Sequence, residues 1–332
     1  MARFSTSLVR VIPWIIGALG EVFHEPSVSH PVGNRSTWRG FYKPGKYVSY
    51  GWRPAAEIMY RMPKCEVGRT AVLERKFGMG RVIAVANQKG GVGKTTTAIN
   101  LSACLAEAGQ SVLAIDFDPQ GNATSGLGME KTELDNTVYE LLIGECDMED
   151  CLVRQLQPNL DLLPSNVNLS GAEIELLDID RKEYILKNCL EKYRDNYDFV
   201  IIDCPPSLSL LTLNAMTAAD TVLVPIQCEY YALEGLSQVL KTVNLVKRKL
   251  NPALEMEGVV FTMYDARTNL SLQVVENVKS NLNQNIYKTI IPRNVRLAEA
   301  PSHGMPITVY DSRSTGAESY RLLAAEVISR GE

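Results

Sequence analysis

The segment from Lys89 to Thr97, with the sequence KGGVGKTTT, constrains the fold more than any other part of this 332-residue chain. It follows a short apolar run over Val82–Ala86 and precedes the helical pattern Ala98–Ala108. A strand, a glycine-rich loop and a helix in this order form a phosphate-binding loop, in which backbone N–H groups point at a phosphate. The sequence therefore predicts a P-loop nucleotide site at the carboxyl end of this strand.

The side chains of this loop predict how the nucleotide is held. Gly90, Gly91 and Gly93 let the backbone adopt conformations that other residues disfavour. The N-terminus of the following helix adds its dipole. Lys94 is placed to reach the β- and γ-phosphates, and the Thr95 hydroxyl is placed to ligate Mg²⁺.

A second lysine, Lys89, precedes the P-loop lysine Lys94 by five positions. A P-loop has no chemical need for a lysine there, on the side of the loop away from its own γ-phosphate. We expect Lys89 to act in trans, where its charge would balance the charge that develops on phosphates held by a second copy of the chain. The sequence therefore predicts a homodimer that forms with ATP.

Two further apolar runs end in acidic residues. Val112–Ile115 leads to Asp116 and Asp118, and Phe199–Ile202 leads to Asp203. One carboxylate of the first pair can hold Mg²⁺ through water while the other orients the attacking water. An apolar strand that ends in Asp is typical of a Walker B site. A lone aspartate at a strand end is more often a helix cap or turn former. Three strand ends that converge on one fold, counting the strand before the phosphate-binding loop, favour a functional interpretation here. We expect Asp116 and Asp203 to bind the metal.

Strands alternate with helices through the rest of the chain. We expect strands over Thr221–Gln227, Gly258–Met263 and Thr289–Pro292, with an amphipathic helix over Ala232–Leu250. Such alternation indicates a parallel sheet with helices on both faces, and right-handed crossovers place the loops at its carboxyl edge. The predicted fold class is α/β: a P-loop NTPase with a doubly wound, mostly parallel sheet in a single domain over residues 79–332.

Residues 1–78 differ in composition from the rest. They carry 12 Lys and Arg against 5 acidic residues, a net charge of +7, whereas the remaining 22 against 33 give −11. Prolines interrupt the segment too often for a sustained periodicity, so no domain is predicted there. Four interpretations stay open: an extra DNA-binding domain, an organellar transit peptide, a disordered basic arm for nucleic acid, or residues that the natural gene does not translate.

We favour the last interpretation. Met79 stands just before the first apolar strand, where a nucleotide-binding domain would begin. The codons of Glu74-Arg75-Lys76 can spell the purine-rich GAAAGGAAG, which is the layout of a bacterial ribosome-binding site. If translation starts at Met79, the intact mass of the protein from its native gene will lack the upstream residues, and a full-length product would contradict the hypothesis.

From Met79 onward the sequence resembles the ParA/Soj branch of the ParA/MinD family of deviant Walker A ATPases. The resemblance rests on KGGVGKTTT, DFDPQGNATSGLG, FVIIDCPPSL and IPRNVRLAEAPSHG. It implies ATP and Mg²⁺ as ligands, ATP-dependent sandwich dimers with Lys89 as the cross-dimer lysine, Asp118 as the residue needed for hydrolysis and Asp203 as Walker B. It also implies non-specific binding of double-stranded DNA and slow hydrolysis that a ParB-type partner stimulates.

The resemblance implies the nucleotide contacts as well. In the family the loop after the strand Thr289–Pro292 wraps the adenine. The expected nucleotide-binding residues are Lys89, Gly90, Gly91, Val92, Gly93, Lys94, Thr95, Thr96, Pro292 and Asn294.

Two arginines match DNA-binding positions of the chromosomal branch: Arg267, in the loop Tyr264–Thr268, and Arg296. A net acidic charge argues against DNA binding on composition alone, but a local basic face can override it. A basic run at a helix C-terminus, Lys247 to Lys249, is a weaker candidate because the helix dipole explains it. Binding by a dimer would depend on ATP and strongly on salt.

Three rival functions fit the sequence less well. A MinD-like membrane-positioning ATPase needs a basic amphipathic helix after the last domain helix, and the sequence ends directly after Gly316–Ile328. An iron–sulfur enzyme needs paired cluster cysteines, and Cys204 is most simply a small buried residue. A pseudo-enzyme would have lost Lys94, Asp118 or Asp203.

The expected setting is the cytoplasm, in association with the nucleoid. The seven cysteines show no CxxC pair, which fits a reducing compartment without zinc or disulfides. The expected function is partitioning of a chromosome or plasmid, and some members of the family also regulate replication initiation or sporulation. No membrane partner is expected.

Overall fold

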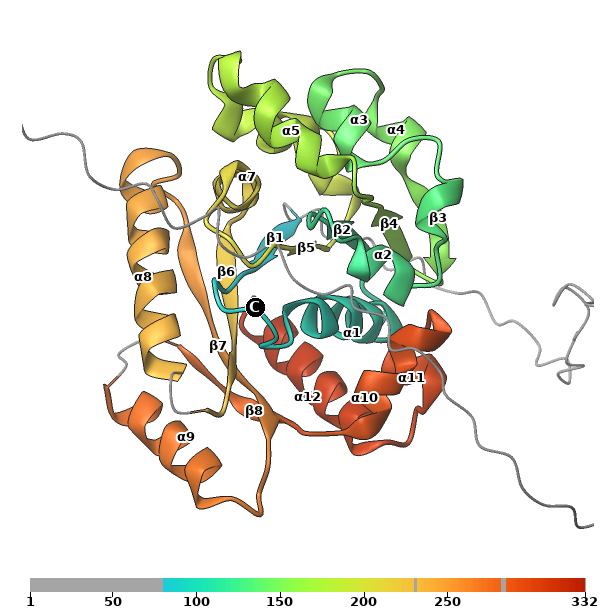
Figure 1. Ribbon diagram of the computed structural model, residues 1–332. Helices are drawn as coiled ribbons and strands as arrows, with labels where there is room; N and C mark the ends of the chain where they lie inside the picture. Colours follow the sequence, from blue (N-terminus) through green and yellow to red (C-terminus); the bar gives the residue numbers. More distant parts are fainter. Residues whose placement is uncertain (1–79, 230–231, 282–284, 332) are drawn as a thin grey trace, which may run out of the picture. The chain divides into compact units, whose positions relative to one another are not determined.

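An eight-stranded sheet runs through the computed structural model, which describes residues 80–229, 232–281 and 285–331 (Figure 1). Its strand order is β3-β4-β2-β5-β1-β6-β7-β8, and every neighbouring pair is parallel except β3 with β4. The strands are β1 (Arg81–Val85), β2 (Val112–Asp116), β3 (Val153–Gln157), β4 (Leu160–Leu163), β5 (Phe199–Asp203), β6 (Thr221–Gln227), β7 (Glu255–Tyr264) and β8 (Ile286–Pro292).

The central strands are buried along almost their whole length. β2 and β5 are buried at every position, and only Arg81 of β1 is partly exposed. Apolar and β-branched residues form such strands because helices cover both faces of a parallel sheet. Successive side chains point to opposite faces, so Val82 and Ala84 belong to one core and Ile83 and Val85 to the other.

Two groups of helices cover the two faces (Figure 1). The core that contains Ile83 is closed by α1 (Lys94–Glu107), α2 (Asn122–Gly126), α10 (Val295–Glu299), α11 (Ile307–Tyr310) and α12 (Thr315–Ser329). The core that contains Val82 is closed by α3 (Val138–Ile143), α4 (Met148–Cys151), α5 (Leu169–Glu175), α6 (Ile185–Leu190), α7 (Leu210–Ala218), α8 (Ala232–Lys249) and α9 (Asn269–Asn281). Short 3-10 turns cover Lys131–Glu133, Leu176–Asp178, Lys182–Tyr184, Arg194–Asn196 and Ala300–His303.

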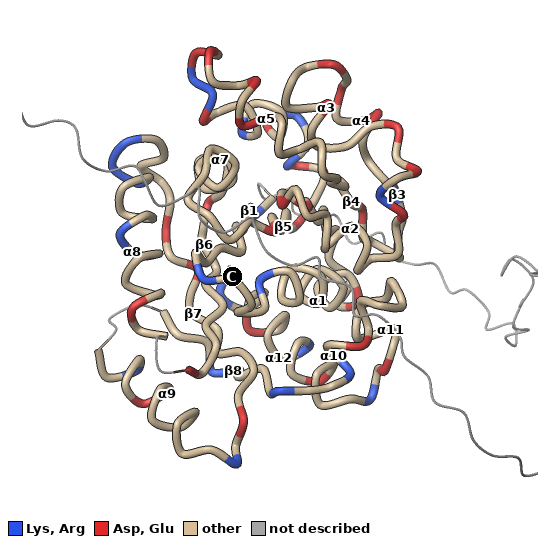
Figure 2. The backbone as a smooth tube through the Cα atoms, in the orientation of Figure 1, with Lys and Arg blue, Asp and Glu red and all other residues tan. Residues whose placement is uncertain are grey.

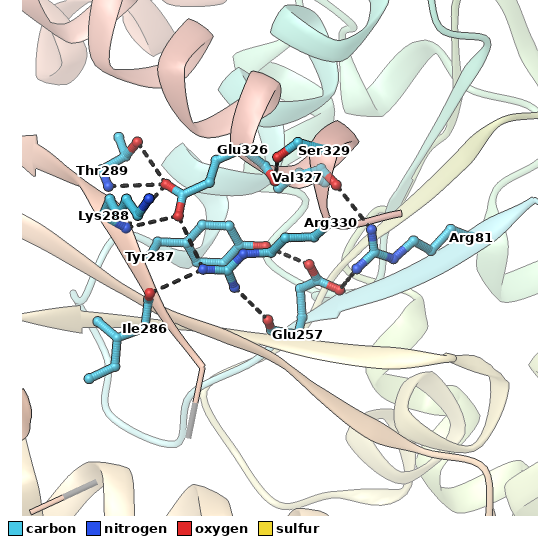
Figure 3. A network of polar contacts seen from close by, with 10 residues as sticks. All are labelled: Arg81, Glu257, Ile286, Tyr287, Lys288, Thr289, Glu326, Val327, Ser329 and Arg330. Atoms are coloured by element: carbon cyan, nitrogen blue, oxygen red, sulfur yellow. Dashed lines mark hydrogen bonds and ion pairs between the residues drawn. The ribbon is translucent and has the colours of Figure 1, made fainter. Parts of the chain in front are cut away.

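A buried polar network ties the amino edge of the sheet to the end of α12 (Figure 3). The carboxylate of Glu257 on β7 has no exposed side-chain surface and pairs with Arg81 of β1. It also accepts a hydrogen bond of 2.5 Å from the Tyr287 hydroxyl of β8 and one of 2.8 Å from Thr221. Arg330, after α12, stacks over the Tyr287 ring and donates to the Glu257 carbonyl. This edge is therefore fixed, and the opposite, carboxyl edge carries the loops.

The structure confirms the predicted fold class and its principal elements. The strand Thr221–Gln227 has the predicted bounds, and the helix predicted over Ala232–Leu250 ends one residue earlier, at Lys249. The sequence analysis did not find β3 or β4, nor the short helices between α2 and α7. The interpretations of residues 1–78, and the proposed start at Met79, lie outside the described residues.

Candidate nucleotide site

The glycine-rich loop joins β1 to α1 in the predicted order. Gly91 and Gly93 have φ angles of 72° and 86°, in the region that favours glycine. Gly93 is the N-cap of α1, and its carbonyl accepts the first helical hydrogen bond from Thr97. The loop therefore presents backbone N–H groups at a helix N-terminus, which is a ready site for phosphate.

Contacts from neighbouring strands fix the loop in this shape. The Thr262 hydroxyl, near the end of β7, donates to the Val92 carbonyl at 2.8 Å, and Val92 is 1% exposed. Asn87 donates to the Pro225 carbonyl of β6 at 2.7 Å and accepts from the Lys89 N–H at 3.0 Å. The cradle is thus held in place by the sheet.

The P-loop lysine, Lys94, is nearly buried. Its ammonium donates to the Lys89 carbonyl at 3.3 Å, the one hydrogen bond that the described residues give it. Burial lowers the pKa of Lys94, while the carboxylates of Asp203 and Asp118 act in the opposite direction. An ammonium with remaining donors and two carboxylates nearby is suited to bind phosphate oxygens.

Asp116 and Asp203 lie side by side at the ends of β2 and β5. They are register partners, and both are buried. Burial raises the pKa of Asp116 to about 6, and burial followed by the charge of Asp116 raises the pKa of Asp203 well above its ordinary value. Two carboxylates buried together are costly unless a cation neutralises them.

The two carboxylates differ in their partners. Asp116 accepts hydrogen bonds of 2.7 Å from both the N–H and the hydroxyl of Thr124, and one of 3.3 Å from the Asp118 N–H. Neither oxygen of Asp203 accepts a hydrogen bond within the described part of the chain. The Thr95 hydroxyl is near enough to lower the pKa of Asp203. Asp203 is therefore the carboxylate that lacks a partner, whereas Asp116 holds the start of α2.

These residues fit Mg²⁺. Across residues 80–229, 232–281 and 285–331, no group of three or more His, Cys, Asp or Glu side chains is arranged to hold a metal by itself. Magnesium is commonly held by one or two carboxylates together with waters and substrate phosphates. Thr95 and Asp203 are adjacent donors of that kind, so the metal would depend on the nucleotide for its other ligands. The assignment of Asp116 as a ligand stays a prediction.

Asp118 lies in the loop between β2 and α2. It is 7% exposed, and its carboxylate accepts a hydrogen bond of 2.9 Å from the Gln120 N–H. The Ser165 hydroxyl donates to its carbonyl at 2.9 Å. Because its charge acts on the pKa of both Lys94 and Asp203, Asp118 belongs to the same electrostatic site.

A pocket of about 350 Å³ adjoins the glycine-rich loop. Pro292 and Asn294, the predicted adenine residues, line it next to Gly93 and Thr96. The Asn294 side chain caps α10 by accepting from the Arg296 N–H, and it donates to the Thr315 hydroxyl at 2.7 Å. Lining residues that the sequence analysis missed are Thr262, Met263, Ile291, Arg293, Val295, Leu297, Ala298 and Tyr320. Of these, Thr262 could have been found as a polar residue near a strand's carboxyl end.

Lys89 has a partner that the sequence did not reveal. Its ammonium lies 2.8 Å from a carboxylate oxygen of Glu229, at the end of β6. Both side chains are partly exposed, Lys89 to 34% and Glu229 to 47%. Lys89 is therefore held at an open edge of the loop, apart from the buried Lys94.

The two predicted DNA-binding arginines lie on the β7–α9 loop and on α10, and each pairs with carboxylates. Arg267 is 86% exposed and makes two hydrogen bonds, of 2.8 and 2.6 Å, to Asp265. Arg296 lies 2.9 Å from Glu299 and 3.5 Å from Asp311. Their charges are balanced locally in this conformation.

Comparisons with known proteins agree with this geometry. A family described as an AAA domain matches residues 80–256. Sporulation initiation inhibitor protein Soj of Bacillus subtilis is 58% identical over 253 residues, which cover 76% of this chain and 100% of Soj. Chromosome partitioning protein ParA of Caulobacter vibrioides is 53% identical over 252 residues, 75% of this chain and 94% of that protein.

A solved structure shares the fold. The crystal structure of cobyrinic acid a,c-diamide synthase from Mycobacterium smegmatis, with ADP and magnesium, is 41% identical. The alignment covers 76% of this chain and 96% of that chain, with a TM-score of 0.68. Because the chain matches the whole length of Soj at 58% identity, it belongs to the Soj/ParA family of chromosome-partitioning ATPases.

Proposed function

We propose that this ATPase binds ATP with Mg²⁺, closes as a homodimer around two nucleotides, binds DNA non-specifically in that state and releases it after hydrolysis. The observation that carries the proposal is the position of Lys89. Its ammonium is held by Glu229 at a partly exposed edge of the loop, while Lys94 is buried in the same loop, where the charges of Asp203 and Asp118 act on it. A lysine so placed is available to phosphates of a second copy.

The nucleotide site supports the first step. Gly91 and Gly93 shape the phosphate cradle, and Lys94 supplies the charge. Thr95 and the unpartnered Asp203 would hold Mg²⁺. The metal, when bound, would neutralise phosphate charge and the buried carboxylates together.

Exposed apolar residues near the loop support the dimer. Leu208 is 48% exposed and lines a small pocket beside Asn87 and Gln88. Leu233, 38% exposed, lies on α8 close to Glu229, and Val167, 71% exposed, borders the loop that carries Asp118. Each of these apolar side chains is exposed beside a loop of the nucleotide site, where a second copy of the chain could cover it.

Asp118 is the proposed group that orients the water for hydrolysis. It lies at the carboxyl edge of the sheet, and of its two carboxylate oxygens only Oδ1 accepts a hydrogen bond from the described residues. A carboxylate with a free oxygen beside the phosphate-binding lysine can position a water for attack. With this assignment, a mutation of Asp118 would stop ATP hydrolysis and leave ATP binding intact.

The distribution of charge supports a DNA-binding face. Residues 130–198 hold 17 acidic against 7 basic residues, so the remainder of residues 79–332 has 16 against 15. Figure 2 shows these acidic residues along α3, α4, β3 and α5, away from α9, which follows the loop with Arg267, and from α10, which contains Arg296. The excess negative charge therefore lies elsewhere, and a phosphate backbone can approach the arginines.

The proposed partner is a ParB-type protein that stimulates hydrolysis on a chromosome or plasmid at the nucleoid. The alternative is a MinD-like ATPase that associates with a membrane. In the described segments no helix is both long and apolar enough to cross a bilayer. A helix that lies on a membrane surface is a different case, which a direct test has to address.

The test is ATP turnover with and without DNA, and with and without the N-terminal peptide of a ParB-type protein. We expect DNA and peptide together to stimulate more than the sum of their separate effects. Vesicles of anionic phospholipid are the parallel arm. Stimulation by vesicles with no response to DNA would overturn the proposal and favour membrane positioning.

A further inference from the structure

Arg293 lies between the two predicted DNA-binding arginines, and the sequence analysis did not assign it a role. It follows the last residue of β8, and its N–H donates to the Tyr264 carbonyl at the end of β7, at 2.9 Å. This bond fixes it beside the loop that carries Arg267. The next residue in the chain, Asn294, is the N-cap of α10, the helix that contains Arg296. Arg267 on the β7–α9 loop, Arg293 directly after β8 and Arg296 on α10 therefore all follow the carboxyl ends of two neighbouring strands, β7 and β8.

Arg293 differs from its neighbours in its partners. Arg267 and Arg296 are each bound to carboxylates. Arg293 is exposed and makes no ion pair with the described residues. Its charge reaches the Asp265 carboxylate, because it contributes to lowering the pKa of that group. Asp265 is thus shared electrostatically by two arginines and directly bound to one.

A phosphate backbone would meet these three side chains unequally. For Arg267 and Arg296 a phosphate must replace a carboxylate, so part of the gain is offset by the pair that breaks. Arg293 has no such pair to break. An exposed guanidinium that makes no ion pair can bind phosphate with two parallel N–H donors and release a condensed counterion from the nucleic acid.

We propose that Arg293 contacts a DNA phosphate and is the principal cation of a strip formed by Arg267, Arg293 and Arg296. The proposal rests on the proposed DNA binding by the ATP-bound dimer. It also links the two ligands, because Arg293 lines the pocket next to Pro292 and Asn294, which we assign to the base of the nucleotide. A change in the shape of that pocket would therefore also change the position of Arg293 relative to Arg267 and Arg296.

The experiment measures DNA affinity of preformed ATP dimers in the hydrolysis-deficient Asp118→Ala background, at several salt concentrations. Arg293→Ala is expected to weaken binding about tenfold, because it removes one exposed guanidinium from each subunit of the dimer. The slope of log K against log salt should become shallower by about one for each phosphate that the variant no longer neutralises. Arg293→Lys should keep most of the salt slope, because it keeps the charge.

The matched control is Arg181→Ala. Arg181 is also exposed, but it precedes the 3-10 turn Lys182–Tyr184 and helix α6, which packs on the core that contains Val82. We expect this variant to bind DNA as the parent does. Equal decreases in affinity for Arg293→Ala and Arg181→Ala would indicate a general charge effect and overturn the proposal.

Two other outcomes would also overturn it, and they are distinguishable. If Arg293→Ala lowers nucleotide affinity or ATP-dependent dimerisation as much as it lowers DNA affinity, the residue acts in the nucleotide pocket. If the parent ATP dimer does not bind DNA at all, the proposed function fails first, and the assignment of Arg293 fails with it. Retained dimers with a reduced DNA affinity and a shallower salt slope would support the proposal.

Discussion

The ammonium of Lys89 lies 2.8 Å from the carboxylate of Glu229 in the same chain, although 140 positions separate the two residues. Gln227 donates to the other oxygen of Glu229 at 2.5 Å and so fixes its orientation. The two lysines of the glycine-rich loop thus occupy different environments: Lys94 is nearly buried beside carboxylates, and Lys89 is at an open edge. These different environments fit the different roles that we propose: Lys94 binds the nucleotide of its own chain, and Lys89 acts on the nucleotide of a second copy.

The first prediction concerns Lys89→Ala. Because this side chain points to Glu229 and not into its own phosphate cradle, we expect the variant to bind ATP within about twofold of the parent affinity. It should lose the ATP-dependent dimer, because the partner's phosphates would lack their cross-dimer charge. Sedimentation with a non-hydrolysable ATP analogue measures the dimer. A variant that still dimerises would remove the argument for Lys89.

Glu229→Gln is the control for that experiment. It removes the ion pair within the chain and keeps the charge of Lys89. The pair is partly exposed, and such pairs contribute only about 0–1 kcal/mol. We therefore expect ATP-dependent dimers to persist. If Glu229→Gln failed to dimerise as Lys89→Ala does, the pair itself, and not an interaction in trans, would explain the loss.

The second prediction concerns Asp118→Ala. The loss of a group that orients the attacking water should lower the rate of ATP hydrolysis by at least about 100-fold. The phosphate cradle and Lys94 remain, so ATP binding and the dimer should persist, and the dimer should stay on DNA. Single-turnover hydrolysis measures the rate. Asp135→Ala, an exposed aspartate before α3, is the control, and an unchanged rate in Asp118→Ala would refute its role.

The sequence was sufficient for the parts of the fold that repeat a simple pattern. β1, β2 and β5 are continuous apolar runs, and the residues that follow each of them form the site, because parallel strands end at one edge. The sequence analysis did not detect β3, because it is an edge strand without a fully buried residue and contains a residue in the left-handed region, Gln155, with φ 52°. Its alternation was too weak to detect.

The hydrogen bonds of the site were beyond a single sequence. Thr262 and Val92 are hydrogen-bonded across 170 positions, and nothing local in either residue indicates the other. The hydrogen bonds of Asp116 were equally beyond the sequence, because its position at a strand end suggested only a metal ligand. Its carboxylate accepts from Thr124, which belongs to the next helix. Motif spacing predicts which residues converge, whereas hydrogen bonding decides which of them has free oxygens.

The third prediction concerns pH, for the protein without nucleotide or metal. Burial raises the pKa of Asp116 from an ordinary value of 3.8 to about 6, and burial also raises the pKa of Asp203 well above that ordinary value. The folded protein therefore keeps protons that the unfolded chain has lost. Stability from this pair is present below about pH 4 and is lost as the pH rises through 6 and above.

Asp203→Asn removes one of the two buried charges. Its melting temperature should rise relative to the parent as the pH increases from about 5 to about 8, by a few °C at the upper end, in a buffer with chelator. Asp135→Asn, an exposed aspartate, should show no such trend. A parent that gained stability over Asp203→Asn toward higher pH would contradict the assignment of Asp203 as a buried, unpartnered carboxylate.

The fourth prediction compares two tyrosines that each donate to a glutamate. The Tyr287 hydroxyl donates to the buried Glu257, whereas Tyr139 donates to Glu175 at 2.9 Å on the surface. Tyr287→Phe leaves a buried carboxylate short of a donor, so the free energy of unfolding should fall by about 1–3 kcal/mol. Tyr139→Phe should leave it nearly unchanged, since water replaces the missing partner. Urea unfolding followed by circular dichroism measures both. Equal effects would mean that the network at the amino edge of the sheet does not stabilise the fold as its burial requires.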